Sequence, residues 1–228
     1  MGTGSSPGGS KHIAVSSVTV QNGRTLTLKS PLVYDRNDKS LTKQARQAVE
    51  TFEQNKKSAA VENVLFTDSN GNQIYTNIGG RNSVSHPAII EGMATVMTHN
   101  HPRPGKYENV LGGTFSPEDI DVLGRHISTV KTIRATAAEG TYSMSIPPTV
   151  RHRTMRTMVA DYRQYIQQIQ GKYTAVNNAK YTDYTNGLCR YRDYKSQCNH
   201  SMNDMLIDLH NWLRNNQKKY GYTYTLEQ

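Results

Sequence analysis

The residues best suited to chemistry lie in the middle of the 228-residue chain, in the segment Thr-His-Asn-His-Pro at positions 98–102. Alternate residues of an extended chain point the same way, so His99 and His101 can both face one metal ion. Two imidazoles do not determine which metal binds, and a lone His-x-His pair is also typical of structural or surface strands. A metal site here needs at least one further ligand.

A carboxylate follows on the next predicted helix. Ser116 is suited to cap the start of this helix, Pro117 to occupy its first position, and Asp119 then lies on the same face as Ser116. His99, His101 and Asp119 would provide three ligands and leave the fourth tetrahedral position of zinc for water, as in catalytic zinc sites. Zinc lowers the pKa of its water from about 15.7 to roughly 7, and a nearby glutamate can accept the proton while hydroxide attacks a carbonyl carbon.

The order Glu62, then His99-Asn-His101-Pro, then Ser116-x-x-Asp119 resembles the JAMM motif of the JAB/MPN metalloprotease superfamily, and HNHP looks most like its RadC-type bacterial branch. The resemblance covers residues from about 40 to 146. It implies a JAB/MPN-like (cytidine-deaminase-like) fold and Zn²⁺-dependent cleavage of a peptide or isopeptide bond. By matching position, it implies that His99, His101 and Asp119 bind zinc, that Glu62 is the general base and acid, and that Ser116 donates a hydrogen bond to the oxyanion.

One departure from the family pattern lies between the second histidine and Asp119, where this chain is longer than the family commonly is. The extra residues predict a pliable loop at 102–115 that gates the site or grips the substrate. If the insertion shifts the alignment, Glu118 or Asp121 becomes the carboxylate ligand instead.

The choice of glutamate also has alternatives. Glu91, which precedes His99 in sequence, is the second choice after Glu62, and Glu53 lies on a preceding helix. Without a catalytic role, Glu62 would be an exposed carboxylate at the start of a strand. Of the remaining histidines, His86 is interpreted as a residue at the start of a helix, and His126 as a satisfied or exposed surface residue. His200 and His210 lie on one helical stretch but do not share a face, so they do not predict a second metal site.

The elements that position these residues follow from hydrophobic periodicity and turn signals. The expected order is a hairpin at 12–34 around Asn22-Gly23, a helix from Ser40 or Thr42, a hairpin at 61–80 around Asn70-Gly71, a short helix near 86–93, a buried strand at 94–98, a helix from Ser116, and two strands at 131–147.

The character of the chain changes beyond Pro147-Pro148. Residues 149–170 and 200–219 have apolar side chains at helical spacing, with a polar, tyrosine-rich stretch between them. We therefore expect a flexible leader at 1–11, a JAB/MPN-like domain at 12–147 and a helical extension at 148–228. The fold class is α/β (α+β), with a mixed, largely antiparallel sheet flanked by helices.

The composition bears on compartment and partners. The net charge of +9 and the mixing of Tyr with Lys and Arg between the last two helices would suit a nucleic acid, although a solvated linker has the same composition. No apolar run is long enough for a membrane span and no secretion signal is present, so we expect no membrane association. Cys189 and Cys198 are interpreted as free thiols in a reducing, cytoplasmic compartment.

Three functions are consistent with these features. The first is a zinc peptidase or isopeptidase that acts on a peptide or on a protein conjugated to a ubiquitin-like modifier. The second is a RadC-like, DNA-associated module without proteolysis. The third is an assembly module of a larger phage or toxin-type protein, with the C-terminal helices docking a protein partner.

Overall fold

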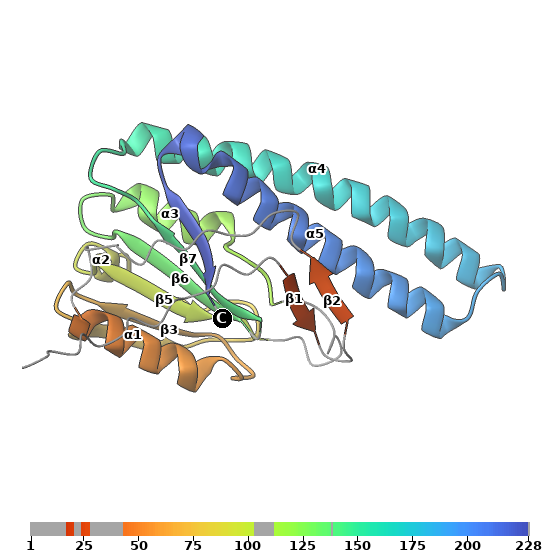
Figure 1. Ribbon diagram of the computed structural model, residues 1–228, viewed down its shortest axis with the longest axis horizontal. Helices are drawn as coiled ribbons and strands as arrows, with labels where there is room; N and C mark the ends of the chain where they lie inside the picture. The colour runs from red at the N-terminus through yellow and green to blue at the C-terminus, as the bar shows by residue number, and fades with distance from the viewer. Residues whose placement is uncertain (1–16, 21–23, 28–42, 103–111, 138, 228) are drawn as a thin grey trace, which may run out of the picture.

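The structure, a computed structural model, describes residues 17–20, 24–27, 43–102, 112–137 and 139–227. At its centre is a mixed six-stranded sheet with strand order β4-β3-β5-β6-β7-β8 (Figure 1). Every neighbouring pair is antiparallel except β5 and β6, which are parallel. The strands are β3 (Asn63–Thr67), β4 (Gln73–Ile78), β5 (Val96–Asn100), β6 (Thr132–Ala137), β7 (Gly140–Ser145) and β8 (Thr223–Glu227). The predicted α+β class, with a largely antiparallel sheet, is confirmed.

Helices cover the two faces of this sheet. Side chains alternate along β5, so Thr98 bonds to Glu53 of α1 (Lys43–Lys56) on one face, and Met97 joins the main hydrophobic core on the other. That core includes residues of α3 (Pro117–Arg125) and of the long helix α4 (His152–Thr185). A short helix, α2 (Ala88–Glu91), precedes β5. Among the described residues, no helix has both the length and the apolar character needed to cross a membrane.

Both predicted hairpins contain paired strands. β1 (Ser17–Val20) and β2 (Arg24–Thr27) form a separate antiparallel sheet, while the turn at Asn22-Gly23 lies outside the described residues. β3 and β4 pair around Asn70-Gly71, where Gly71 has a φ of 87°. A Cβ at Gly71 would lie 2.5 Å from the Cα of Ala45, so this turn packs directly on α1 and requires glycine. The predicted caps of α1, Ser40 and Thr42, also lie outside the described residues.

The last two helices form an antiparallel hairpin that extends well beyond the sheet (Figure 1). The tyrosine-rich stretch, expected as a linker, is mostly helical: α4 continues to Thr185 and α5 (Tyr191–Tyr220) begins shortly afterwards. Ring contacts stabilise the far end of the hairpin, because Tyr194 of α5 stacks on Tyr184 of α4 and makes a tilted contact with Tyr181. Cys189 and Cys198 near this end are free thiols, as predicted.

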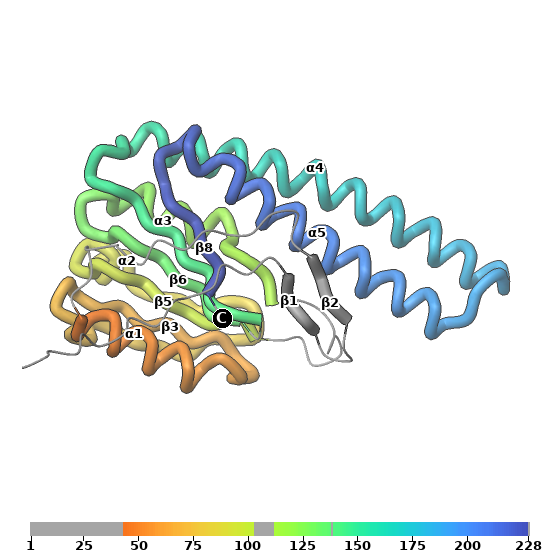
Figure 2. Tube along the Cα trace, in the orientation of Figure 1, coloured from red at the N-terminus to blue at the C-terminus, as the bar shows by residue number. Residues whose placement is uncertain are grey.

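The sequence analysis did not anticipate β8, the strand that follows α5. Gly221, with a φ of 79°, ends α5, and the chain then returns along β7 as an edge strand (Figure 2). Arg134 of β6 holds this strand in place, because its guanidinium bonds to Glu53 of α1 at 2.6 Å and to Glu227 of β8 at 3.0 Å. The sheet therefore includes a strand from beyond the expected domain boundary at residue 148.

Candidate metal centre

Strand β5 positions the two histidines of the motif. The backbone N–H of His101 donates to the carbonyl of Thr136 at 2.8 Å, so the extended pairing with β6 continues past the end of the strand. His99 and His101 therefore lie on the same side of the chain, as expected for alternate residues. This is the side of the sheet on which Met97 and α3 lie.

The side chains of His99, His101 and Asp119 converge. The two Nε2 atoms are 2.9 Å apart, and His99 Nε2 lies 3.4 Å from Asp119 Oδ1. Zinc–nitrogen bonds of about 2.0–2.1 Å require tetrahedral ligands to lie roughly 3.3 Å from one another. The spacing of these atoms is close to that value, and the described residues contain one group of this kind, in which all ligand atoms lie within 4.8 Å.

The start of α3 fixes the orientation of the carboxylate. Asp119 N–H donates to Ser116 Oγ at 3.1 Å, while Ser116 N–H and the Ser116 hydroxyl both donate to Asp119 Oδ2 at 2.8 Å. This is a capping box in which aspartate takes the place usually filled by glutamate or glutamine. Because Oδ2 is held by Ser116, Oδ1 is left to face His99.

The ionisation of the three side chains is set by burial and by one another. Burial favours the neutral form of His99, but the charge of Asp119, its hydrogen bond and the charge of Glu62 together raise the pKa of His99. Burial favours the neutral form of Asp119 as well, yet His99 and His101 hold the pKa of that carboxyl well below its usual range. The pKa of His101 is lowered to about 4 by burial and by the charge of His99. Asp119 and the two imidazoles thus form a site that favours a positive charge between them.

Glu62 lies beside this centre, just before β3. Val64 pairs with His99 across β3 and β5, and continuing this register by two residues places Glu62 opposite His101. Its side chain is buried apart from a small exposed part that lines the same cleft as the histidines. Burial raises the pKa of Glu62; the nearby charge of His99 opposes this rise and that of Asp119 adds to it. The Glu62 carboxyl therefore holds a proton more readily than an exposed glutamate does.

Asn100, between the two histidines, holds the backbone around Glu62. Its Oδ1 accepts the N–H of Asn63 at 2.7 Å, and its amide donates to the carbonyl of Val61 at 3.0 Å. The Asn63 side chain also donates to Oδ1 at 3.1 Å. One fully buried side chain therefore connects the strand that carries the imidazoles to both neighbours of Glu62.

The alternative carboxylates lie elsewhere. Glu91 is buried against His86, Arg125 and His126, and Glu53 bonds to Arg134 on the opposite face of the sheet. Glu118 is exposed on the rim and pairs with Arg163 at 3.2 Å, and Asp121 faces Arg125 at 3.4 Å. None of the four belongs to the group formed by His99, His101 and Asp119.

The sequence analysis missed a series of buried hydrogen bonds next to the centre. Gly113 accepts a hydrogen bond from His101 Nδ1 at 3.1 Å, which leaves Nε2 to face His99 and Asp119. The following residue, Thr114, bonds to Tyr224 Oη at 2.6 Å, and Tyr224 bonds to His210 Nδ1 at 2.5 Å. The sequence indicated only that His210 does not form a metal site with His200; the structure shows that His210 is buried and stacked on Tyr142. Helical spacing indicated only that α5 has a buried face, not this contact with β8.

A cleft of about 690 Å³ gives access to the centre. Its lining includes Arg81 from the connection after β4, and Ile166 and Leu206 from α4 and α5. Pro102 and Gly112 lie at its edge, but residues 103–111 of the expected gating loop lie outside the described residues. The arrangement can hold a divalent cation, place a carboxylate beside it and admit a substrate. No protein-family model, curated protein or solved structure matches the chain.

Proposed function

We propose that this protein is a zinc-dependent hydrolase of the JAMM type that cleaves a peptide or isopeptide bond. The observation that carries the proposal is the meeting of His99, His101 and Asp119 in a cleft that also contains Glu62. Three protein ligands leave one tetrahedral position for water, which is the arrangement of catalytic zinc sites.

The residues fit a zinc ion in their chemistry. Neutral imidazole and carboxylate are ordinary zinc ligands, and the low pKa values of His101 and Asp119 keep both in their metal-binding forms at neutral pH. The bond from His101 to Gly113 is the type of outer contact that orients a ligating histidine. Zinc, when bound, acts as a Lewis acid that lowers the pKa of a coordinated water toward about 7.

The other residues perform the proton transfers. Glu62 accepts the proton of the attacking water and delivers it to the leaving amine nitrogen, so its carboxyl ends the cycle as it began. The Ser116 hydroxyl turns from Asp119 Oδ2 to donate to the oxyanion that forms on the substrate carbonyl. Asp119 keeps its bond to the backbone N–H of Ser116 during this change and stays in position.

The JAB/MPN fold is part of the same proposal. It is supported by a mixed sheet in which the His-x-His strand occupies an inner position, and by the helix that begins with the Ser-x-x-Asp motif. The hairpin of α4 and α5 and the strand β8 are additions for which the resemblance supplies no counterpart.

Metal content and cleavage, measured on the same preparations, test the function. The zinc-loaded full chain is incubated with a proteome-derived peptide library and with ubiquitin-like conjugates, and new amino termini are identified by mass spectrometry. We expect Glu62→Gln to keep its zinc and lose cleavage, whereas Asp119→Asn loses both. Glu50→Gln, on the exposed face of α1, is the matched control and retains both. Zinc-loaded wild-type protein that cleaves nothing, or Glu62→Gln that cleaves normally, contradicts the proposal.

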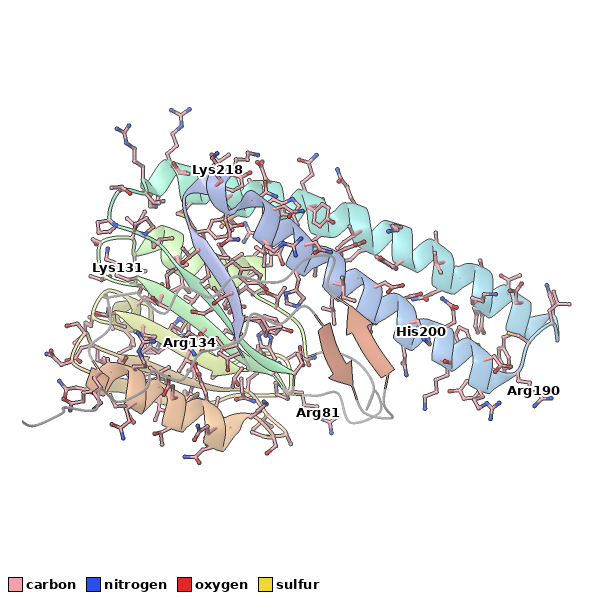
Figure 3. The ribbon with its side chains drawn as sticks, viewed as in Figure 1. Arg81, Lys131, Arg134, Arg190, His200 and Lys218 are labelled. Carbon is pink, nitrogen blue, oxygen red and sulfur yellow. The ribbon has the colours of Figure 1, made fainter. Side chains whose placement is uncertain are left out.

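A second function is favoured by the far end of the helical hairpin. Tyr184 and Tyr194 stack with ring centroids 5.8 Å apart, Tyr191 is exposed beside them, and Arg190 lies at the tip (Figure 3). Exposed aromatic rings among cations are typical of surfaces that bind single-stranded nucleic acid. Binding of a fluorescent oligonucleotide should weaken steeply with salt and in Tyr191→Ala, and should not change in Glu62→Gln. If Tyr191→Ala binds as wild type does, a protein partner at the exposed Leu188 becomes the better interpretation.

A further inference from the structure

We propose that one face of α5 forms a binding subsite for a large apolar side chain next to the bond that is cut. The inference rests on the proposed function, because the metal centre marks where the scissile bond lies. The occupant is a flexible apolar residue of a peptide substrate, such as leucine, methionine or norleucine, in contrast to a small or charged residue.

The subsite is a continuous apolar stripe. Met202, Met205, Leu206 and Leu209 recur at helical spacing, and all four line the cleft together with Ile166 of α4. Met205, Leu206 and Ile166 are only partly buried, although they pack against the main core. The helical hairpin therefore leaves apolar surface open to the cleft, which is where a ligand side chain would bury it.

This stripe lies directly beside a candidate metal ligand. A Cβ placed on Gly113 would lie 3.6 Å from Leu206 Cδ2 and 4.0 Å from His101 Nδ1. Leu206 and the His101 imidazole therefore both lie close to Gly113. A peptide with its carbonyl at the metal centre would place a neighbouring side chain against α5.

The two walls of the cleft differ in character, which gives a substrate a preferred direction. The polar wall is the part of the lining that carries Arg81, Asn82 and Ser83. Methionine side chains are flexible and adapt to ligands of different shape, so the subsite should accept several large apolar residues and reject charged ones. The polar wall is left to face the peptide backbone.

Two hydroxamates that differ only in their tails test the subsite. Acetohydroxamate and hexanohydroxamate carry the same metal-binding group, and each buried CH₂ increases affinity about fourfold. By isothermal titration calorimetry on the zinc-loaded full chain, we expect hexanohydroxamate to bind at least tenfold more tightly. The double variant Met205→Gln/Leu206→Gln should reduce this ratio below about threefold and leave acetohydroxamate binding unchanged. Leu188→Gln, at the exposed tip of the hairpin, is the control and should keep the full ratio.

A second variant tests the subsite if the double variant does not fold. Met202→Trp fills the stripe with an indole, keeps the helix apolar and should reduce the affinity ratio in the same way. A wild-type ratio near one, or the full ratio in folded Met202→Trp, overturns the subsite.

A probe without a metal-binding group separates the subsite from the proposed function. Hexanamide is titrated into metal-free protein with ¹³C-labelled methionine methyl groups, and shifts of Met202 and Met205 report occupancy. If these methyls shift while acetohydroxamate fails to bind the zinc-loaded protein, the proposed function is overturned and the subsite stands. If the methyls do not shift, the subsite is overturned.

Discussion

At the scale of single residues, the candidate centre consists of the buried His99 and the partly buried His101 and Asp119, whose ionisation depends on one another. His99 and Asp119 stabilise each other's charged forms, while His101 stays neutral because burial and the neighbouring imidazole lower its pKa to about 4. Removing Asp119 would therefore leave the two close imidazoles with Glu62 as the remaining nearby negative charge. The two Nε2 atoms and Asp119 Oδ1 are spaced close to the distances that zinc ligands require.

Asn100 gives the first prediction, because it holds the backbone on both sides of Glu62. Asn100→Ala leaves the buried N–H of Asn63 without an acceptor, which should lower the free energy of unfolding by about 1–3 kcal/mol. Zinc content should not change, whereas the cleavage rate should fall on the order of 100-fold, as expected for a shift of about 1 Å in a reacting group. Asn77→Ala, which removes an exposed amide bond to Ser85, is the control and should leave the rate unchanged.

His210 gives a prediction for the dependence of stability on pH. Burial, and to a lesser extent the charge of His101, lowers the pKa of His210 to about 3, below its ordinary value of 6.5. Between these two values the unfolded chain binds a proton that the folded protein does not, so the contribution of His210 to stability is complete above pH 6.5 and is lost as the pH falls toward 3. The loss is about 1.4 kcal/mol for each pH unit within this window.

Urea unfolding in EDTA between pH 7 and pH 4 measures this effect. His210→Phe keeps an aromatic ring against Tyr142 and should show a smaller loss of stability over this range than wild type. His152→Gln, at the exposed start of α4, should behave as wild type does. Equal slopes for wild type and His210→Phe would show that His210 does not titrate as a buried group.

At the scale of elements, the start of α3 combines a helix cap with a metal ligand. Ser116→Ala removes the cap and should lower the free energy of unfolding by about 0.5–2 kcal/mol. The same change removes the hydroxyl bond to Asp119 Oδ2 and leaves the bond from the backbone N–H, so zinc affinity should fall by about tenfold in a competition titration with a chelator. Ser116→Thr retains a capping hydroxyl and should restore both properties. An affinity in Ser116→Ala equal to that of wild type would mean that the cap does not orient the ligand.

Most elements around the centre could be predicted because their signals are local. Alternation and the Asn70-Gly71 turn indicated β3 and β4, and Ser116 with Pro117 indicated the first residue of α3. The strand β8 could not be predicted in the same way, since its five residues acquire a role only by pairing with β7, far away in sequence. The contacts of Asn100 with Val61 and Asn63 depend equally on the register of distant strands.

At the scale of the whole molecule, the C-terminal part of the chain belongs to the sheet. The helical hairpin carries the apolar wall of the cleft, and β8 carries Tyr224, which bonds to Thr114 next to the ligand-orienting Gly113. Removing residues 149–228 would expose the edge of β7 and part of the core. We therefore expect such a truncated chain to lose its fold, which makes point variants the better tools for separating the functions.

The ion pairs that Arg134 makes with Glu53 and Glu227 allow a test of how firmly β8 is held to the rest of the molecule. Arg134→Met leaves the carboxylates of Glu53 and Glu227 buried without their counter-ion, and should lower the free energy of unfolding by about 3–5 kcal/mol. Arg163→Met removes an exposed pair with Glu118 and should cost about 1 kcal/mol or less. Chemical denaturation of both variants provides the comparison. Similar losses in the two would show that β8 is not held by this network.

The most direct test of the metal centre is the position of zinc in crystals of the zinc-loaded protein, located by anomalous scattering at the zinc edge. We predict one strong peak within about 2.0–2.2 Å of His99 Nε2, His101 Nε2 and Asp119 Oδ1. Crystals of Asp119→Asn should lack this peak. A zinc ion bound at other residues, or no peak at these three side chains in the wild-type protein, would contradict the account.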